Sequence, residues 1–299
     1  MWEPDPSWRE LPGKGGPATV GVWLAEAEGR RWVVKRLAAP DERTRAVTDL
    51  TYAGYWRREA EVALHPGVVD GPGLVPPDLG QVGEDDEGVT VWSLEQEGEP
   101  PTGLFVARAL GRFAGATHET PPWASRRLLA DRLEMAEERG GWRTLGRTTL
   151  SDVADRLWER RHHWLRVCSE GPEGRLHGDA VPANFLTSRA EDVVTVDWQC
   201  FGVGPVGSDI GYYALSSREE FDVLVDAFLA GVGPDADRDA ITQAARVTAV
   251  YSVLTRAEWA LAQAARGEGA LAGKFRHPAV APHLRALQRQ FPQIEALIS

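Results

Sequence analysis

Residues 177–184 read His-Gly-Asp-Ala-Val-Pro-Ala-Asn, and Asp197 ends the apolar run that follows them. This order supplies a carboxylate, an amide oxygen and a second carboxylate, with glycine and proline shaping the loop between them. Phosphoryl transfer from ATP needs such a set, because one acid orients the attacking hydroxyl and two oxygen ligands hold Mg2+ against the phosphates. We therefore predict that Asp179 is the catalytic base and that Asn184 and Asp197 bind the metal ion.

The residues that follow His-Gly-Asp distinguish a kinase loop from a simple turn. His-Gly-Asp by itself is also typical of a turn closed by an Asx hydrogen bond. Here it is followed in order by Asn184, by the apolar run Val193–Val196 and by Asp197. A turn requires none of these later residues, so the complete pattern favours a kinase.

The complete pattern resembles that of the aminoglycoside phosphotransferase and choline kinase-like family, which has the protein-kinase-like fold. Protein kinases usually have arginine at the position of Gly178 and Asp-Phe-Gly where residues 197–199 read Asp-Trp-Gln, so both departures favour small-molecule kinases. The resemblance implies that His177 supports the loop and that Asp209 braces it from the following helix. Asp209 also suits a helix N-cap, and the two roles are compatible.

Size and charge limit the classes of function. The chain has 299 residues, of which 43% are hydrophobic, enough for a sizeable core and for two lobes. Its net charge of -11 would repel nucleic acid, whereas a cationic small molecule would be attracted. A surplus of acid is also common in soluble proteins. With only two cysteines, no basic and apolar leader and no run of about 18 apolar residues, we expect a cytoplasmic protein without a membrane span.

The residue pattern predicts a β-rich part followed by a mainly helical part, and the resemblance implies that this is an α+β, bilobal protein-kinase-like fold. A small β-rich nucleotide-binding lobe is expected over residues 1–109, and a larger, mainly helical lobe over 110–299 would bind the acceptor. Gly/Pro-rich residues 97–103 indicate a hairpin turn, and residues 175–209 a strand-rich insert that carries the motif. Strands are expected over residues 20–25, 31–37, 89–94 and 104–107. Helices are expected over residues 43–64, 123–138, 150–168, 217–230 and 238–265.

The predicted strand over residues 31–37 contains the candidate phosphate ligand. Alternation places Val33 and Lys35 on one face, and Val34 and Arg36 on the other. By resemblance, Lys35 would contact the α- and β-phosphates of the nucleotide, which leaves Arg36 as the solvated alternative.

This lysine needs an acid to hold it. Glu59 falls on the more aromatic face of the predicted helix, whereas Glu61 falls on the side of Arg57 and Arg58. We therefore expect Glu59 to pair with Lys35. Either glutamate also suits an ordinary surface pair between residues four apart.

Two further segments are candidates for the nucleotide site. The glycine-rich segment 13–16 precedes a strand, so the backbone N–H groups of Gly15 and Gly16 can cover phosphates. Pro17 removes one donor, and a simple turn is the alternative. By family geometry, adenine would lie against the backbone of Ala107 and Ala109, between the lobes. The chain has no Gly-x4-Gly-Lys-Ser/Thr pattern, which argues against a P-loop enzyme.

Together these observations predict an ATP- and Mg2+-dependent O-phosphotransferase, with GTP as a possible donor. On family frequency the acceptor is an antibiotic, such as an aminoglycoside, or a related hydroxylated metabolite, which suggests antibiotic resistance. Alternatives are a sugar, a nucleoside-like compound or choline as acceptor, and an inactive nucleotide-binding regulatory protein of the same fold. The oligomeric state stays open. Candidate groups for ammonium ions or sugar rings are Glu219, Glu220, Asp222, Asp226, Trp123, Trp142 and Trp158.

Overall fold

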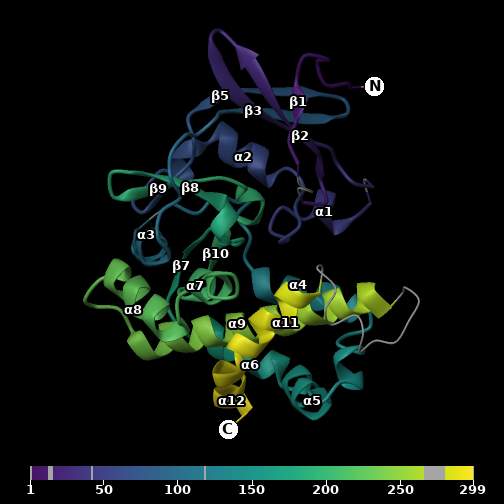
Figure 1. Ribbon diagram of the computed structural model, residues 1–299, viewed down its shortest axis with the longest axis vertical. Helices are drawn as coiled ribbons and strands as arrows, with labels where there is room; N and C mark the ends of the chain where they lie inside the picture. Colours follow the sequence, from purple (N-terminus) through teal and green to yellow (C-terminus); the bar gives the residue numbers. More distant parts are fainter. Residues whose placement is uncertain (1, 13–15, 42, 118, 266–279, 299) are drawn as a thin grey trace.

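The computed structural model has two lobes, with a small β-sheet lobe above a larger helical lobe (Figure 1). It describes residues 2–12, 16–41, 43–117, 119–265 and 280–298. The predicted α+β, bilobal arrangement is confirmed. In these residues no helix is both long and apolar enough to cross a bilayer.

The small lobe is built on one five-stranded antiparallel sheet in the order β1-β2-β3-β6-β5. Three of its strands were predicted, because each is a short run rich in valine and other β-prone residues. β5 was missed because it is an edge strand with mostly exposed, polar residues and no apolar alternation. The strands are β1 (Arg9–Glu10), β2 (Thr19–Ala27), β3 (Arg30–Leu37), β5 (Leu79–Asp85) and β6 (Gly88–Leu94).

The single helix predicted over residues 43–64 is in fact two short helices, α1 (Arg45–Thr48) and α2 (Arg58–Leu64). The chain leaves the helix at Asp49, whose side chain accepts hydrogen bonds from the backbone and hydroxyl of Thr51. Such local side-chain bonds compete with helical ones. α2 then packs under the sheet through the buried residues Ala60, Leu37, Val89 and Val91.

The strand predicted over residues 104–107 is wrong, because these residues begin helix α3 (Gly103–Gly115). A short apolar run suits either element, and Thr102 caps the helix by accepting a hydrogen bond from the backbone N–H of Phe105. The predicted hairpin turn over 97–103 is therefore part of the connection between β6 and α3. The expected lobe boundary at 109/110 falls inside α3, and we propose residues 95–102 as the link between the lobes.

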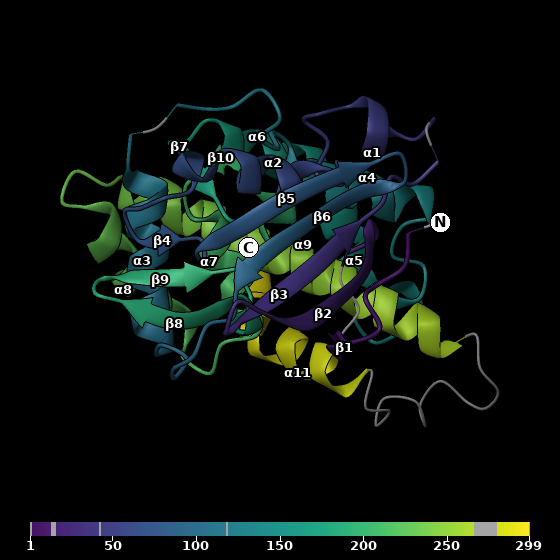
Figure 2. The same ribbon diagram turned by 90° about the horizontal axis from the view of Figure 1, so that it is seen from above.

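Helices α4 (Leu128–Glu138), α8 (Phe221–Val232) and α9 (Arg238–Ala265) correspond to predicted helices. The helix predicted over 150–168 breaks at Arg160. The other helices of the larger lobe are α5 (Ser151–Glu159), α6 (Arg161–Ser169), α7 (Ser208–Tyr213), α11 (Ala281–Arg289) and α12 (Phe291–Ile298). Viewed from above, the five-stranded sheet lies across these helices, with α3 and α8 at one end (Figure 2). The core is centred on α9, where Val247, Val250 and Leu254 are fully buried.

Two small sheets hold the motif region in place. β7 (Glu173–Leu176) pairs with β10 (Gly202–Pro205), and β8 (Phe185–Arg189) forms a hairpin with β9 (Asp192–Thr195). β4 (Leu74–Val75) adds a parallel strand to β9. The loop 177–184 therefore lies between β7 and β8, and Asp197 follows β9.

Candidate functional site

The loop 177–184 is fixed by a network of hydrogen bonds. The carboxylate of Asp209, at the start of α7, accepts the backbone N–H groups of His177 at 2.6 Å and Gly178 at 2.9 Å. Nδ1 of His177 accepts the N–H of Asp179 at 3.2 Å, so Nε2 carries the proton and donates to the carbonyl of Val196 at 2.9 Å. His177 thereby ties the loop to the segment that carries Asp197.

Position 178 requires glycine because of its backbone conformation and the atoms that lie close to it. Its φ is +82°, in the region that favours glycine, and a Cβ there would lie 2.2 Å from the carbonyl oxygen of Cys200. No side chain fits without moving that backbone, which is the local reason for glycine between His177 and Asp179.

Asn184 lies against the backbone of Asp179. Its Nδ2 donates to the carbonyl of Asp179 at 2.9 Å and lies 3.5 Å from Oδ2 of the same residue. Among the described residues no donor bonds its Oδ1, so this oxygen is available to a metal ion. The backbone N–H of Val196 also bonds the carbonyl of Asn184 at 3.0 Å, which holds the two candidate metal ligands close together.

Lys35 lies between two carboxylates. Its Nζ is 2.5 Å from Oε2 of Glu59, on α2, and 2.8 Å from Oδ1 of Asp197. Burial alone lowers the pKa of Lys35, but the two carboxylates outweigh it and hold that pKa above its usual range. The lysine is therefore a permanent cation that joins the two lobes.

The alternatives to Lys35 and Glu59 have other partners. Glu61 pairs with Arg57 at 2.8 Å, one helical turn away. Arg36 is not solvated, contrary to expectation, because it is 2% exposed and pairs with Asp85 at 2.6 Å. Asp85 lies at the polar end of β5, a strand that was not predicted. The sequence of β3 alone therefore did not reveal that Arg36 is buried.

The glycine-rich segment approaches the same place. Gly15 lies outside the described residues. Gly16 is packed against the side chain of Gln199, since a Cβ on Gly16 would lie 1.8 Å from Oε1 of that glutamine. Gln199 in turn places its amide nitrogen 3.4 Å from Oδ2 of Asp197. Gly16 is thus linked to Asp197 through one side chain.

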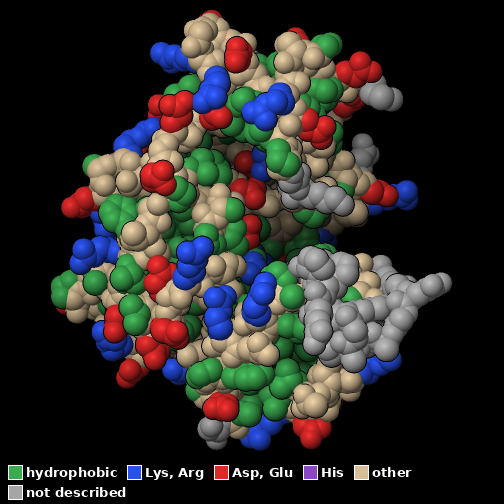
Figure 3. All heavy atoms as spheres, in the orientation of Figure 1, with side chains coloured by type: hydrophobic (Ala, Val, Ile, Leu, Met, Phe, Trp, Pro, Cys, Tyr) green, Lys and Arg blue, Asp and Glu red, His purple; other side chains and the backbone are tan. Residues whose placement is uncertain are grey.

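A cavity of about 540 Å3 lies between the lobes and brings four of the predicted residues together, namely Lys35, Glu59, Asn184 and Asp197. Figure 3 shows this region as a hollow with acidic side chains in it. The cavity also contacts the end of β6 and the link that follows, through Leu94 and Gln96. Its remaining walls are mostly apolar and include Val22, Val33, Val91, Leu186 and Val196.

Ala107 and Ala109 do not line this cavity. Both lie inside helix α3 and are at most 1% exposed. Their backbone groups were expected to follow a strand, and that strand is the incorrect element described above. The link that contacts the cavity begins earlier, at residues 95–96.

A buried arginine was missed by the sequence reasoning. Arg58 is fully buried on α2 and donates to backbone carbonyls of both lobes, including that of Ala53 in the small lobe and that of Trp123 in the larger one. Burial lowers its pKa to about 10. No pattern marks it, because its partners are backbone atoms scattered along the chain.

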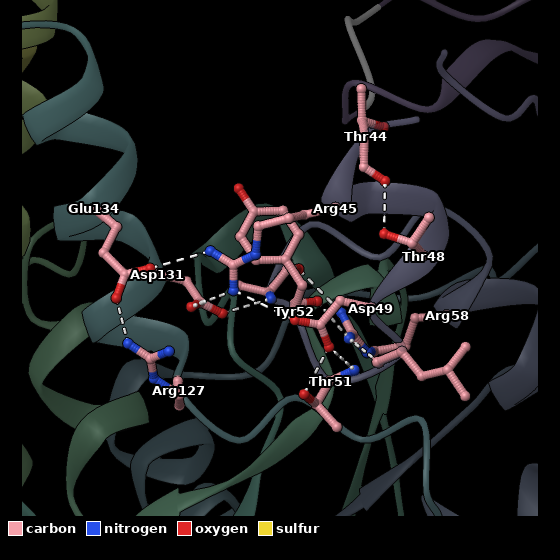
Figure 4. Close-up of polar contacts among 12 residues, drawn as sticks. Thr44, Arg45, Thr48, Asp49, Thr51, Tyr52, Arg58, Arg127, Asp131 and Glu134 are labelled. Atoms are coloured by element: carbon pink, nitrogen blue, oxygen red, sulfur yellow. Dashed lines mark hydrogen bonds and ion pairs between the residues drawn. The ribbon is translucent and has the colours of Figure 1, made fainter. Parts of the chain in front are cut away.

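Helix α4 forms a second contact between the lobes (Figure 4). Arg45 of α1 reaches Asp131 at 3.4 Å and Glu134 at 3.1 Å, and its guanidinium lies 4.2 Å from the ring centre of Tyr52. The buried carboxylate of Asp131 also accepts the backbone N–H of Ala53 at 2.8 Å. These bonds fix α4 relative to the small lobe.

The residue after Asp131 on α4 reaches the loop 177–184. Nη2 of Arg132 donates to the carbonyl of Gly178 at 2.6 Å. A signal for Arg132 exists in the sequence, because it lies at helical spacing from Leu128 and Leu129 and so places a charge on an apolar face.

A family model described as "Phosphotransferase enzyme family" matches residues 16–243, more than half of the chain. No curated protein matches the chain. The solved structures that share its fold include three that each have 15% sequence identity to this chain. Choline kinase LicA from Streptococcus pneumoniae has a TM-score of 0.56, over 95% of this chain and 92% of that chain.

The other two structures are a thermostable mutant of aminoglycoside phosphotransferase APH(4)-Ia and amicoumacin kinase hAmiN in complex with AMP-PNP, Ca2+ and Ami. The first has a TM-score of 0.59, over 97% of this chain and 94% of that chain. The second has a TM-score of 0.58, over 98% and 89%. The resemblance indicated by the sequence pattern is confirmed. The chain belongs to the phosphotransferase enzyme family, whose members are small-molecule kinases that act on hydroxyl groups.

Proposed function

We propose that this protein is an ATP- and Mg2+-dependent O-phosphotransferase that transfers the γ-phosphate to a hydroxyl of a small molecule. The observation that carries the proposal is the double ion pair of Lys35 with Glu59 and Asp197, in the same cavity as Asn184. A lysine held in this way is positioned to contact phosphates, and the neighbouring carboxylate and amide oxygens suit Mg2+.

Asn184 and Asp197 fit a magnesium ion. In the described part of the chain Oδ1 of Asn184 has no hydrogen-bond donor, and 23% of the Asp197 side chain is exposed. The described residues contain no ready group of three or more His, Cys, Asp or Glu side chains, so phosphate oxygens and water would complete the coordination. When bound, the ion would neutralise charge on the β- and γ-phosphates.

We place the nucleotide base in the apolar part of the cavity. The link after β6 contacts this part through Gln96, so its backbone is the proposed partner of the base edge, in place of Ala107 and Ala109. The AMP-PNP and Ca2+ in the amicoumacin kinase complex support a nucleotide and a divalent cation in this fold. We propose ATP as the donor, with GTP as the second donor to test.

Asp179 is the proposed catalytic base. It orients the acceptor hydroxyl and accepts its proton as the new O–P bond forms, while the bond from the γ-phosphorus to the β,γ-bridging oxygen breaks and ADP leaves. Asp209, His177 and Arg132 hold its loop from different sides, so the carboxylate is positioned before the substrate binds.

An antibiotic or a related hydroxylated metabolite is our proposed acceptor, with sugars, nucleoside-like compounds and choline as alternatives. Charge separates these classes. An aminoglycoside or choline carries ammonium groups, which need carboxylates or aromatic faces around them. The surroundings of Asp179 therefore bear directly on the acceptor.

The proposal is tested by ADP release from Mg-ATP with a panel of hydroxylated acceptors. The conservative variant Asp179→Asn should retain Mg-ATP binding and lose acceptor-dependent release by about 10^2- to 10^4-fold. Asp78→Asn, at an exposed surface pair with Arg189, is the matched control and should behave as wild type. Turnover near the wild-type rate in Asp179→Asn would disprove the assignment. Mg-ATP binding by the wild type without release for any acceptor would favour the inactive regulatory protein.

A further inference from the structure

Two arginines contact one tyrosine ring beside the loop of Asp179. Arg132 of α4, which bonds the carbonyl of Gly178, has its guanidinium 4.5 Å from the ring centre of Tyr212. Arg256 of α9 lies 4.1 Å from the same ring centre. Tyr212 belongs to α7, whose first turn carries Asp209, so the ring is fixed relative to the loop. One positive charge is thereby held near the carboxylate of the proposed catalytic base, and the second is held against the same tyrosine ring.

Neither arginine forms an ion pair with a carboxylate among the described residues. Arg132 is held by the carbonyl of Gly178, the sulfur of Cys200 and the ring, and Arg256 is held by the ring and hydroxyl of Tyr212. A guanidinium has five N–H donors and is always charged, so most of these donors are available to another anion. Two cations held against one ring also repel each other, and an anion that contacts both would relieve that cost.

The positive charge continues into a neighbouring pocket of about 290 Å3 between α7, α9 and α11. Its described lining contains Arg256, Arg285, Arg289 and His283, and no Asp or Glu. Burial, and then nearby Arg256, lower the pKa of His283, so the arginines supply the charge. Figure 3 shows Lys and Arg side chains gathered on the helical lobe just below the hollow. In a chain of net charge -11, this local reversal of sign is informative.

Five of the seven groups expected to bind a cationic acceptor are engaged elsewhere. Glu219 accepts hydrogen bonds from Ser217, and Asp226 pairs with Arg238 at 2.7 Å. Trp123 and Trp142 are buried in the core, and Trp158 packs against Trp142 with ring centres 5.0 Å apart. These contacts give no support to an ammonium site or an aromatic cage built from these residues.

We infer that the acceptor carries an anionic group, a carboxylate or a phosphate, close to the hydroxyl that is phosphorylated, and that Arg132 and Arg256 bind it. This inference rests on the proposed function, because it assigns the acceptor class of that same site. Guanidinium groups bind planar carboxylates and phosphates through paired hydrogen bonds, which fix orientation as well as charge. The bound anion would hold the hydroxyl toward Asp179.

The first experiment compares anionic acceptors with related neutral ones. Calorimetric binding and ADP release are measured for gluconate against glucose, for glycerate against glycerol, and for glucose 6-phosphate. Kanamycin and choline are the cationic arms. At least one anion should bind, at least tenfold more tightly than its neutral counterpart. The carboxylate and phosphate arms identify which anion is preferred. Neutral or cationic compounds that bind as tightly as the anions, or anions that all fail to bind, would overturn the inference.

The second experiment removes one arginine. Arg256→Gln should weaken the best anion about tenfold, leave its neutral counterpart unchanged, and retain Mg-ATP binding. Arg256→Lys should restore part of the loss because it restores the charge. Arg238→Gln, at the exposed start of the same helix, is the control. Unchanged anion affinity in Arg256→Gln would contradict the inference.

The two proposals fail in different ways. Anion binding is measured both with and without nucleotide, so it does not depend on turnover. A protein that binds the anion but neither binds Mg-ATP nor releases ADP would disprove the kinase function and retain the anion site. Acceptor-dependent ADP release with neutral or cationic compounds alone would support the kinase function and disprove the anion site.

Discussion

The two sides of Asp179 hold their cations in different ways. On the nucleotide side, Lys35 is bonded to two carboxylates at 2.5 and 2.8 Å. On the acceptor side, Arg132 and Arg256 contact a carbonyl and the ring of Tyr212, and neither has a carboxylate partner among the described residues. The cation of the first side is bonded directly to carboxylates, whereas no carboxylate among the described residues is bonded to the cations of the second side.

This difference corresponds to the tasks that we assign to the two sides. A nucleotide brings Mg2+ with it, so the nucleotide side needs a carboxylate that can bind this ion as well as a fixed cation. The acceptor side has no such companion ion, and arginines that are not bonded to a carboxylate would select the charge of the ligand there. Changes on the first side should therefore affect the reaction with every acceptor, whereas a change at Arg256 should affect only anionic ones.

The largest effect is expected from Glu59→Gln, which removes one of the two carboxylates that hold Lys35. A misplaced lysine misaligns the phosphates, so kcat/KM should fall about 10^2-fold for any acceptor. Glu61→Gln, two residues along the same helix, should stay near wild type because Glu61 pairs with Arg57 instead. Steady-state kinetics of both variants with Mg-ATP checks this. Equal losses of kcat/KM in the two variants would show that the effect comes from changes to helix α2 in general and not from the ion pair of Glu59 with Lys35.

A smaller effect is expected from Arg132→Lys. The variant keeps the positive charge but loses the planar group that donates to the carbonyl of Gly178. We expect kcat to fall about tenfold, with the affinity for Mg-ATP unchanged, because the loop of Asp179 is less well held. A loss of nucleotide affinity instead would place Arg132 on the nucleotide side. Rapid-quench measurement of the chemical step distinguishes the two results.

The nucleotide side was largely predictable from the sequence because its residues are marked locally. Lys35 occurs at an alternating strand position, Glu59 on one face of a helix, and Asp179, Asn184 and Asp197 in one short motif. The structure brings the lysine together with its acid and with Asp197. The adenine contact expected at Ala107 and Ala109 depended on one element, an apolar run over 104–107 that suits a strand and a helix equally and is a helix in the structure.

The acceptor side could not be predicted in the same way. Arg132, Tyr212 and Arg256 come from three helices that are far apart in the chain, and packing alone brings them together. Acids near the start of α8 seemed better candidates because their charge is visible in the sequence. Their use in local bonds, such as that of Asp226 with Arg238, appears only in the fold.

The smallest expected effect concerns the ionisation of Tyr212 and tests whether both arginines act on the ring. Burial raises the pKa of Tyr212, while Arg132 and Arg256 oppose the rise by favouring the phenolate. Arg256→Gln removes one opposing charge, so the pKa should rise further. Alkaline absorbance titration checks this, with Tyr212→Phe to identify the signal among the five tyrosines. A pKa that falls or does not move would mean that Arg256 is not close to the ring in solution.

The same shift predicts a change in stability. Because the folded-state pKa of Tyr212 lies above its ordinary value of about 10, the unfolded chain loses this proton first as pH rises. The stabilisation from Tyr212 is thus complete below about pH 10 and is lost as pH rises through the folded-state pKa. In Arg256→Gln that loss should continue to higher pH, whereas Tyr212→Phe should remove this contribution altogether. Urea unfolding at pH 8 and at several alkaline values measures the difference, and it separates an arginine that acts on the ring from one that is merely nearby.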